Sequence, residues 1–108
     1  MTLPEIQATI VDPQTKTIKH VPVENISPKF IDSLNLEQCY YEGRRTFFYS
    51  SPDETLDSWT FEDRDVKQTF YGTTYVLGLR ADSGESNSEI FFPPSIHQRF
   101  ISNYIFFK

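Results

Sequence analysis

The sequence predicts one α+β domain spanning residues 1–108, with a mostly antiparallel sheet, one short helix in the N-terminal half and a second helix near the C-terminus. Three observations lead to this prediction. Ten phenylalanines, six tyrosines and one tryptophan stand against one methionine, and a core built of rings favours sheet over a helical bundle. Short runs of alternating or β-branched apolar residues recur between turn sequences, as in successive strands. Two proline-containing sequences are followed by apolar residues at helical spacing.

The chain begins with a predicted β-hairpin. Residues 6–10 alternate between apolar and polar side chains, which is typical of a half-buried strand. Asp12 and Pro13 supply turn chemistry, because proline presets φ and the aspartate can accept hydrogen bonds from the following amides. Residues 16–23 are rich in β-branched side chains and form the return strand, with Pro22 at a sheet edge or at the strand end.

A short helix is expected after the hairpin. Ser27 can cap its N-terminus, and Pro28 fits the first helical position. Phe30, Ile31 and Leu34 then lie at helical spacing, so we expect about two to three turns.

Two further strands are expected over residues 37–42 and 46–50, with a tight turn at Gly43 and Arg44 between them. Residues 59–70 are ambiguous, because their apolar side chains suit either a strand or a helical turn. The middle of the chain therefore predicts a second hairpin followed by a segment of undetermined type.

Residues 73–80 form the strongest predicted strand. Apolar side chains line both of its faces, so we expect both faces to be covered. Gly78 leaves room for another backbone or a helix to approach. A brief strand over residues 90–92 follows a polar loop.

The C-terminal part predicts the second helix. Ser95 can cap it, and it carries Ile96, Phe100 and Ile101. Residues 104–107 form an apolar tail, which we expect to pack on the body of the protein or on another subunit.

Composition excludes several classes of protein. Apolar residues make up 38% of the chain, and no apolar run approaches the roughly 18 residues of a membrane span. The N-terminus lacks the pattern of a signal peptide, and the single cysteine excludes an internal disulfide and a multi-cysteine zinc site. The formal charge of −5 disfavours direct binding to nucleic acid or to anionic membranes. We therefore expect a cytoplasmic protein.

The sequence predicts no catalytic, metal-ligating or cofactor-binding residue. His20 and His97 lie far apart in the chain, and Cys39 falls within a predicted strand, where a buried inert thiol is the ordinary state. Four glycines provide no phosphate-binding loop, and no acidic run has the spacing of a calcium hand. Arg44 and Arg45 are interpreted as an exposed turn, with bidentate binding of a phosphate or carboxylate as the alternative. A small enzyme or a metal- or ligand-binding module with a composite acidic site stays open as an alternative.

One segment is unusual, because residues 53–65 contain six acids and one base, a local charge of −5 that equals the charge of the whole chain. The only tryptophan lies at its centre. Such a segment is interpreted either as a docking surface for a protein with a basic surface or as a solvated loop that keeps the protein soluble. The candidate partner-binding residues are Asp53, Glu54, Asp57, Trp59, Phe61, Glu62, Asp63 and Asp65.

Two functional hypotheses follow. The first is a non-catalytic binder that inhibits or regulates a larger macromolecule, masking a basic, nucleic-acid-binding groove with its acids while Trp59 and Phe61 fill a pocket. It requires an exposed indole beside contiguous carboxylates. The second is a self-associating structural or accessory subunit, a homodimer held by exposed rings in residues 39–41 and 104–107.

Two stretches of the chain also resemble a small uncharacterised domain family of phages and bacteria. Members of that family open with a Val-Asp-Pro hairpin and carry a Gly-x-x-x-Val-x-Gly strand downstream. The resemblance rests on Val11-Asp12-Pro13, on the following residues 16–23, and on the strand from Gly72 through Val76 to Gly78. It implies an α+β scaffold without an activity, and it is compatible with a phage or mobile-element accessory role.

Overall fold

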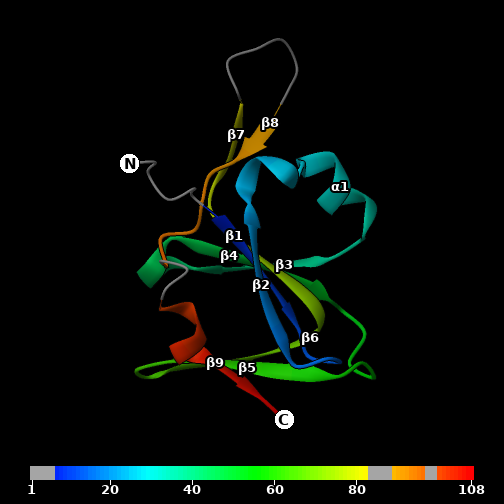
Figure 1. The fold of residues 1–108 in the computed structure, drawn as a ribbon, viewed down its shortest axis with the longest axis vertical. Helices are drawn as coiled ribbons and strands as arrows, with labels where there is room; N and C mark the ends of the chain where they lie inside the picture. Colours follow the sequence, from blue (N-terminus) through cyan, green and yellow to red (C-terminus); the bar gives the residue numbers. More distant parts are fainter. Residues whose placement is uncertain (1–6, 83–88, 97–99) are drawn as a thin grey trace.

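Strands dominate the computed structural model, which describes residues 7–82, 89–96 and 100–108 (Figure 1). Within these residues there are nine strands and one short α-helix, so the predicted α+β class with two helices is wrong and the fold is essentially all-β. The strands are β1 (Gln7–Asp12), β2 (Thr17–Pro22), β3 (Glu37–Tyr41), β4 (Thr46–Ser51), β5 (Ser58–Asp63), β6 (Val66–Leu77), β7 (Arg80–Asp82), β8 (Glu89–Phe91) and β9 (Ile105–Phe107). The helical elements are η1 (Val23–Asn25), α1 (Pro28–Ser33), η2 (Glu42–Arg44) and η3 (Ile101–Tyr104).

The long strand β6 organises the main sheet. The C-terminal half of β6 is the central strand of an arrangement with the order β2-β1-β6-β4-β3. The N-terminal half of β6 pairs with β5, which in turn pairs with β9. All of these pairs are antiparallel. The change of partner falls at Gly72, whose φ of 70° lies in the left-handed region, and beside it the register of β4 shifts between Tyr49 and Ser51. Figure 1 accordingly shows β5 and β9 crossing below the strands of the central sheet.

Each face of the central sheet has its own core. One core lies between the sheet and the β5–β9 layer, and the other lies under α1 and β8. Val76 belongs to the first and Leu77 to the second, which confirms that both faces of the predicted strand over residues 73–80 are covered. The buried residues of the first core are Val11, Phe48, Trp59, Phe61, Phe70, Val76, Ile96, Ile101 and Ile105.

Several local predictions are confirmed. The Ser27 hydroxyl accepts a hydrogen bond from the amide of Phe30 at 3.1 Å, and Pro28 begins α1, as their positions in the sequence indicate. Gly78 is approached by another backbone: a Cβ at this position would collide with the carbonyl oxygens of Phe92 and Pro93. The Gly78 amide donates to the carbonyl of Phe92 at 2.8 Å, so the β7–β8 hairpin is held against the end of β6.

The C-terminal helix is not formed as predicted. Residues 101–104 make a single 3-10 turn, and residues 97–99 lie outside the described residues. The tail forms β9, because Ile105 and Phe107 alternate inward and pair with Phe61 and Trp59. Ile96 and Ile101 of the predicted helix are both buried in the first core, so tertiary contacts outweigh the weak local preference for a helix.

Residues 59–70 form the β5–β6 hairpin rather than a helical turn. Arg64, with a φ of 57°, lies at its tip. Within the described ranges, no helix is long and apolar enough to cross a bilayer.

Candidate functional site

Both predicted ring anchors lie in the core. Trp59 is 0% exposed and Phe61 is 1% exposed, so the expected exposed indole is wrong. The Trp59 Nε1 donates to the Thr74 hydroxyl at 2.9 Å, which satisfies the buried indole. The cause is the alternation of β5, which turns Trp59, Phe61 and Asp63 toward the central sheet, where Phe48 packs against both rings.

The acids of residues 53–65 do not form one contiguous patch. Asp53, Glu54 and Asp57 lie in the loop before β5, whereas Glu62 and Asp63 lie at its other end. A strand rises by about 3.3 Å per residue, so β5 separates the two groups by about 20 Å. Asp65 lies with the second group, in the β5–β6 turn.

The turn end of β5 is neutralised by a polar cluster. The Asp63 carboxylate is 4% exposed and accepts hydrogen bonds from the Arg44 Nε and from the Tyr41 hydroxyl, both at 2.8 Å. The same guanidinium donates to the Tyr104 hydroxyl at 3.2 Å and lies 5.3 Å from that ring's centroid. Arg44 holds the pKa of Asp63 below its usual range, while burial and Asp63 raise the pKa of Tyr41. Arg44 is therefore half-buried and binds a carboxylate with two of its nitrogens, which is the alternative interpretation, whereas Arg45 is exposed as expected.

Sequence reasoning missed this cluster. Tyr41 and Asp63 both occupy inward positions of their strands. In the sequence, Asp63 continues the alternation of Trp59 and Phe61, which could have indicated its inward position if the segment had been assigned to a strand. Their proximity depends on the packing of β5 over the central sheet, and 22 residues separate them in the chain. At the same end, Glu62 pairs with Lys67 across the hairpin at 3.4 Å.

The loop end of β5 carries acids that are not neutralised. Asp53, Glu54 and Asp57 are exposed, and none of them forms an ion pair within the described part of the chain. The loop is nevertheless ordered by its own hydrogen bonds. Asp53 Oδ1 accepts from the amide and the hydroxyl of Thr55 at 3.0 and 2.6 Å, and these bonds lower the pKa of Asp53. The Leu56 amide donates to the Asp53 carbonyl at 3.3 Å.

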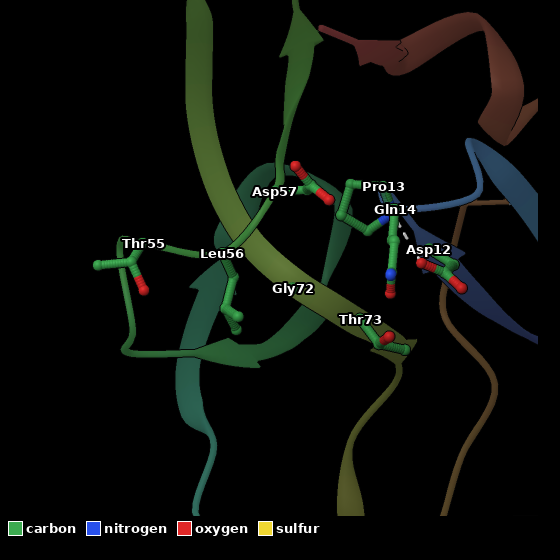
Figure 2. Close-up of a pocket in the computed structure, with 8 residues that line it drawn as sticks. All are labelled: Asp12, Pro13, Gln14, Thr55, Leu56, Asp57, Gly72 and Thr73. Atoms are coloured by element: carbon green, nitrogen blue, oxygen red, sulfur yellow. Dashed lines mark hydrogen bonds between the residues drawn. The ribbon is translucent and has the colours of Figure 1, made fainter.

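This loop forms one wall of a pocket of about 410 Å³, and the β1–β2 turn forms the other (Figure 2). Asp57 lines the first wall and Asp12 the second, so two acidic residues contribute to one hollow. Asp12 Oδ1 accepts from the Gln14 amide at 3.0 Å, which fixes the turn. The lining residues are Asp12, Pro13, Gln14, Thr55, Leu56, Asp57, Gly72 and Thr73.

Gly72 supports the floor of this pocket. Its amide donates to the Asp57 carbonyl at 2.8 Å, and the Leu56 side chain packs over it so closely that a Cβ there would lie 2.9 Å from Leu56 Cδ1. A neighbouring hollow of about 320 Å³ shares Leu56 and Asp57 and adds Lys16 and Lys108. Asp57 therefore lines both hollows, with Asp12 in the first and with Lys16 and Lys108 in the second.

The pocket is suited to a cation. Two carboxylates can accept charge-assisted hydrogen bonds from an ammonium or guanidinium group, and Leu56, which is 44% exposed, offers an apolar contact for the methylene stem. Among the described residues, no three His, Cys, Asp or Glu side chains group as metal ligands would.

A cysteine–histidine dyad is not assembled by the described residues. Cys39 on β3 and His20 on β2 lie at opposite ends of the five-strand order, and burial raises the pKa of the Cys39 thiol. His97 lies outside the described residues. Cys39 thus has the half-buried position of a structural thiol.

Comparisons with family models, curated proteins and solved structures find no match to this chain. The resemblance to a phage and bacterial domain family therefore stays a prediction. Of the predicted partner-binding residues, the structure brings Asp57 to the pocket, with Asp53 and Glu54 in the adjoining loop. Sequence reasoning assigned Asp12 only to a turn, because its position opposite Asp57 depends on the crossing of β6.

Proposed function

We propose that this chain is a small non-catalytic binding module that captures a lysine or arginine side chain of a larger partner protein. The capture site is the pocket between the β1–β2 turn and the loop at residues 52–57. The observation that carries the proposal is the placement of Asp12 and Asp57 on two walls of one hollow, without an ion pair among the described residues.

Physical chemistry supports a basic partner. Like charges that share one site repel each other, and a cation between them removes that repulsion. Hydrogen bonds to charged groups contribute about 1.5–3 kcal/mol each, less where water competes as it does here. Because the pocket is open to solvent, binding is expected to weaken as salt rises. Occupation of a basic surface by this protein would mask it from other ligands, as expected of an inhibitor or regulator.

The exposed acids outside the pocket have a separate role in this proposal. Asp53 and Glu54 adjoin the loop wall and extend the negative potential toward an approaching partner. Such charges increase the association rate, whereas contacts within the pocket set the dissociation rate. Trp59 and Phe61 contribute only by supporting β5 from the core.

A titration with a hexa-arginine peptide tests the proposal. We expect chemical-shift changes at the amides of Gln14, Leu56 and Asp57, and small changes at the β5–β6 turn. The affinity measured by calorimetry should fall at least tenfold in the double variant Asp12→Asn/Asp57→Asn, and it should also fall from low to moderate salt.

The matched control is Glu62→Gln/Asp65→Asn, which changes the net charge by the same amount at the other end of β5. It should change the affinity less than threefold. Equal losses of affinity in both double variants would mean that peptide binding depends only on the overall charge of the protein. The pocket would then have no specific role. A hexa-lysine peptide distinguishes recognition of an ammonium group from recognition of a guanidinium group.

A further inference from the structure

The two edges of the five-strand sheet differ in how they are protected against pairing with another chain. The edge strand β2 contains Lys19 and ends at Pro22, and lysine and proline both discourage the addition of a further strand. The edge strand β3 contains neither, and its five pairs with β4 run without a register shift. In the part of the chain that the structure describes, β3 pairs only with β4, so its outer edge is free.

We propose that β3 pairs antiparallel with β3 of a second copy of this chain, with the two-fold axis at Cys39. The two Cys39 residues would then lie directly opposite each other. In this register Gln38 of each copy faces Tyr40 of the other, and Glu37 faces Tyr41. No two like charges are opposed along the pair, so the edge is complementary to itself.

Aromatic packing supports this register. Tyr40 is 48% exposed and stacks on Phe47 of β4 with ring centroids 4.5 Å apart. The two Tyr40 side chains become diagonal neighbours across the axis, at about 7–8 Å, which is within reach of aromatic rings. The pairs of stacked rings in the two copies thus join into one row, and the exposed Tyr40 rings become covered.

Charge supports a second copy as the occupant of this edge. Glu37 and Tyr41 lie on the same face of β3, Glu37 exposed and Tyr41 half-buried, and the Tyr41 hydroxyl shares the Asp63 carboxylate with Arg44. Pairing places Glu37 of each copy beside Tyr41 of the other, near an Arg44 side chain that is 35% exposed. The axis repeats this favourable contact, so each dimer contains it twice.

Crosslinking of the single cysteine tests the register. A short bis-maleimide should convert the protein to a species of twice the chain mass, at mildly alkaline pH because burial raises the pKa of the Cys39 thiol. The control is Cys39→Ser/Phe106→Cys, which moves the thiol to β9 and should give less than a tenth of the product. A wild-type yield no higher than that of the control would overturn the proposed register.

Sedimentation equilibrium tests the edge itself. Tyr40→Lys should raise the dissociation constant of the dimer at least tenfold, because the two lysines would repel across the axis. Phe106→Lys replaces a ring of similar exposure, 49%, on another edge and should change the constant less than twofold.

A second pair of variants covers the case in which Tyr40→Lys does not fold. Glu37→Arg should weaken the dimer at least fivefold, and Glu54→Arg, with the same charge change in an exposed loop, should not. A wild-type chain that stays monomeric at millimolar concentration would overturn the proposal, as would equal effects of the two arginine variants.

Discussion

The two ends of β5 carry similar numbers of acidic residues, but the charges around these residues differ between the two ends. At the turn end, η2 places Arg44 beside Asp63, and the guanidinium compensates the charge of the buried carboxylate. At the loop end, β1 brings Asp12, a second acid, to the pocket that Asp57 lines. The first arrangement stabilises the fold, whereas the second leaves Asp12 and Asp57 without an ion pair among the described residues. Local charge alone does not say which residues stabilise and which are available to a partner.

The largest effect is expected from breaking the turn end. Arg44→Met should lower the free energy of unfolding by about 3 kcal/mol, because it leaves the Asp63 carboxylate buried without a cation. Urea denaturation at pH 7 measures this loss. Arg45→Met, a neighbouring exposed arginine, is the matched control and should change stability by less than about 0.5 kcal/mol. Similar losses in both variants would contradict the special position of Arg44.

Acid should remove the contribution of the same cluster. The pKa of Asp63 is lowered in the folded state, so its stabilising contribution is complete above the unfolded-state value, near 3.8, and is lost as the pH falls further. The difference in unfolding free energy between the wild type and Asp63→Asn should therefore narrow progressively as the pH falls below the unfolded-state pKa. Chemical denaturation at a series of pH values measures it. A difference that stays constant with pH would show that Asp63 is not ionised in the folded protein.

An intermediate effect is expected at the floor of the pocket. Gly72→Ala should cost about 1–2 kcal/mol, because φ is positive there and the new Cβ meets Leu56. Adding Leu56→Ala removes the close contact but leaves the backbone strain, so a double-mutant cycle separates the two costs. If Gly72→Ala costs the same free energy with and without Leu56→Ala, the close contact with Leu56 contributes nothing to that cost.

The smallest change in stability is expected from Asp57→Asn. Removal of one of two unneutralised carboxylates should leave the free energy of unfolding unchanged or raise it by about 0.5 kcal/mol. The same variant should weaken binding of the hexa-arginine peptide at least threefold. A loss of stability greater than 1 kcal/mol would instead make Asp57 a structural residue and remove the contrast between the two ends of β5.

Several elements were predictable because their causes are local. The Ser27 cap, the proline at the start of α1 and the turn after β1 each depend on residues within four positions of one another. The close approach at Gly78 was also anticipated, although the segment that approaches was not. The prediction of a C-terminal helix was wrong, because Ile96 and Ile101 are buried in the core between the central sheet and the β5–β9 layer without forming one face of a helix.

Composition and short-range pattern were enough to indicate a chain rich in strands and an unusual concentration of acids around one tryptophan. They did not indicate which side chains of β5 would face inward, because residues 59–70 suited either a strand or a helical turn. That orientation follows from the packing of Trp59 and Phe61 against Phe48, and it also carries Asp63 toward Arg44. The pocket likewise needs the β1–β2 turn and the loop before β5 to lie beside Gly72 and Thr73 of β6. Such contacts join distant parts of the chain, and only the burial of the shared core brings them together.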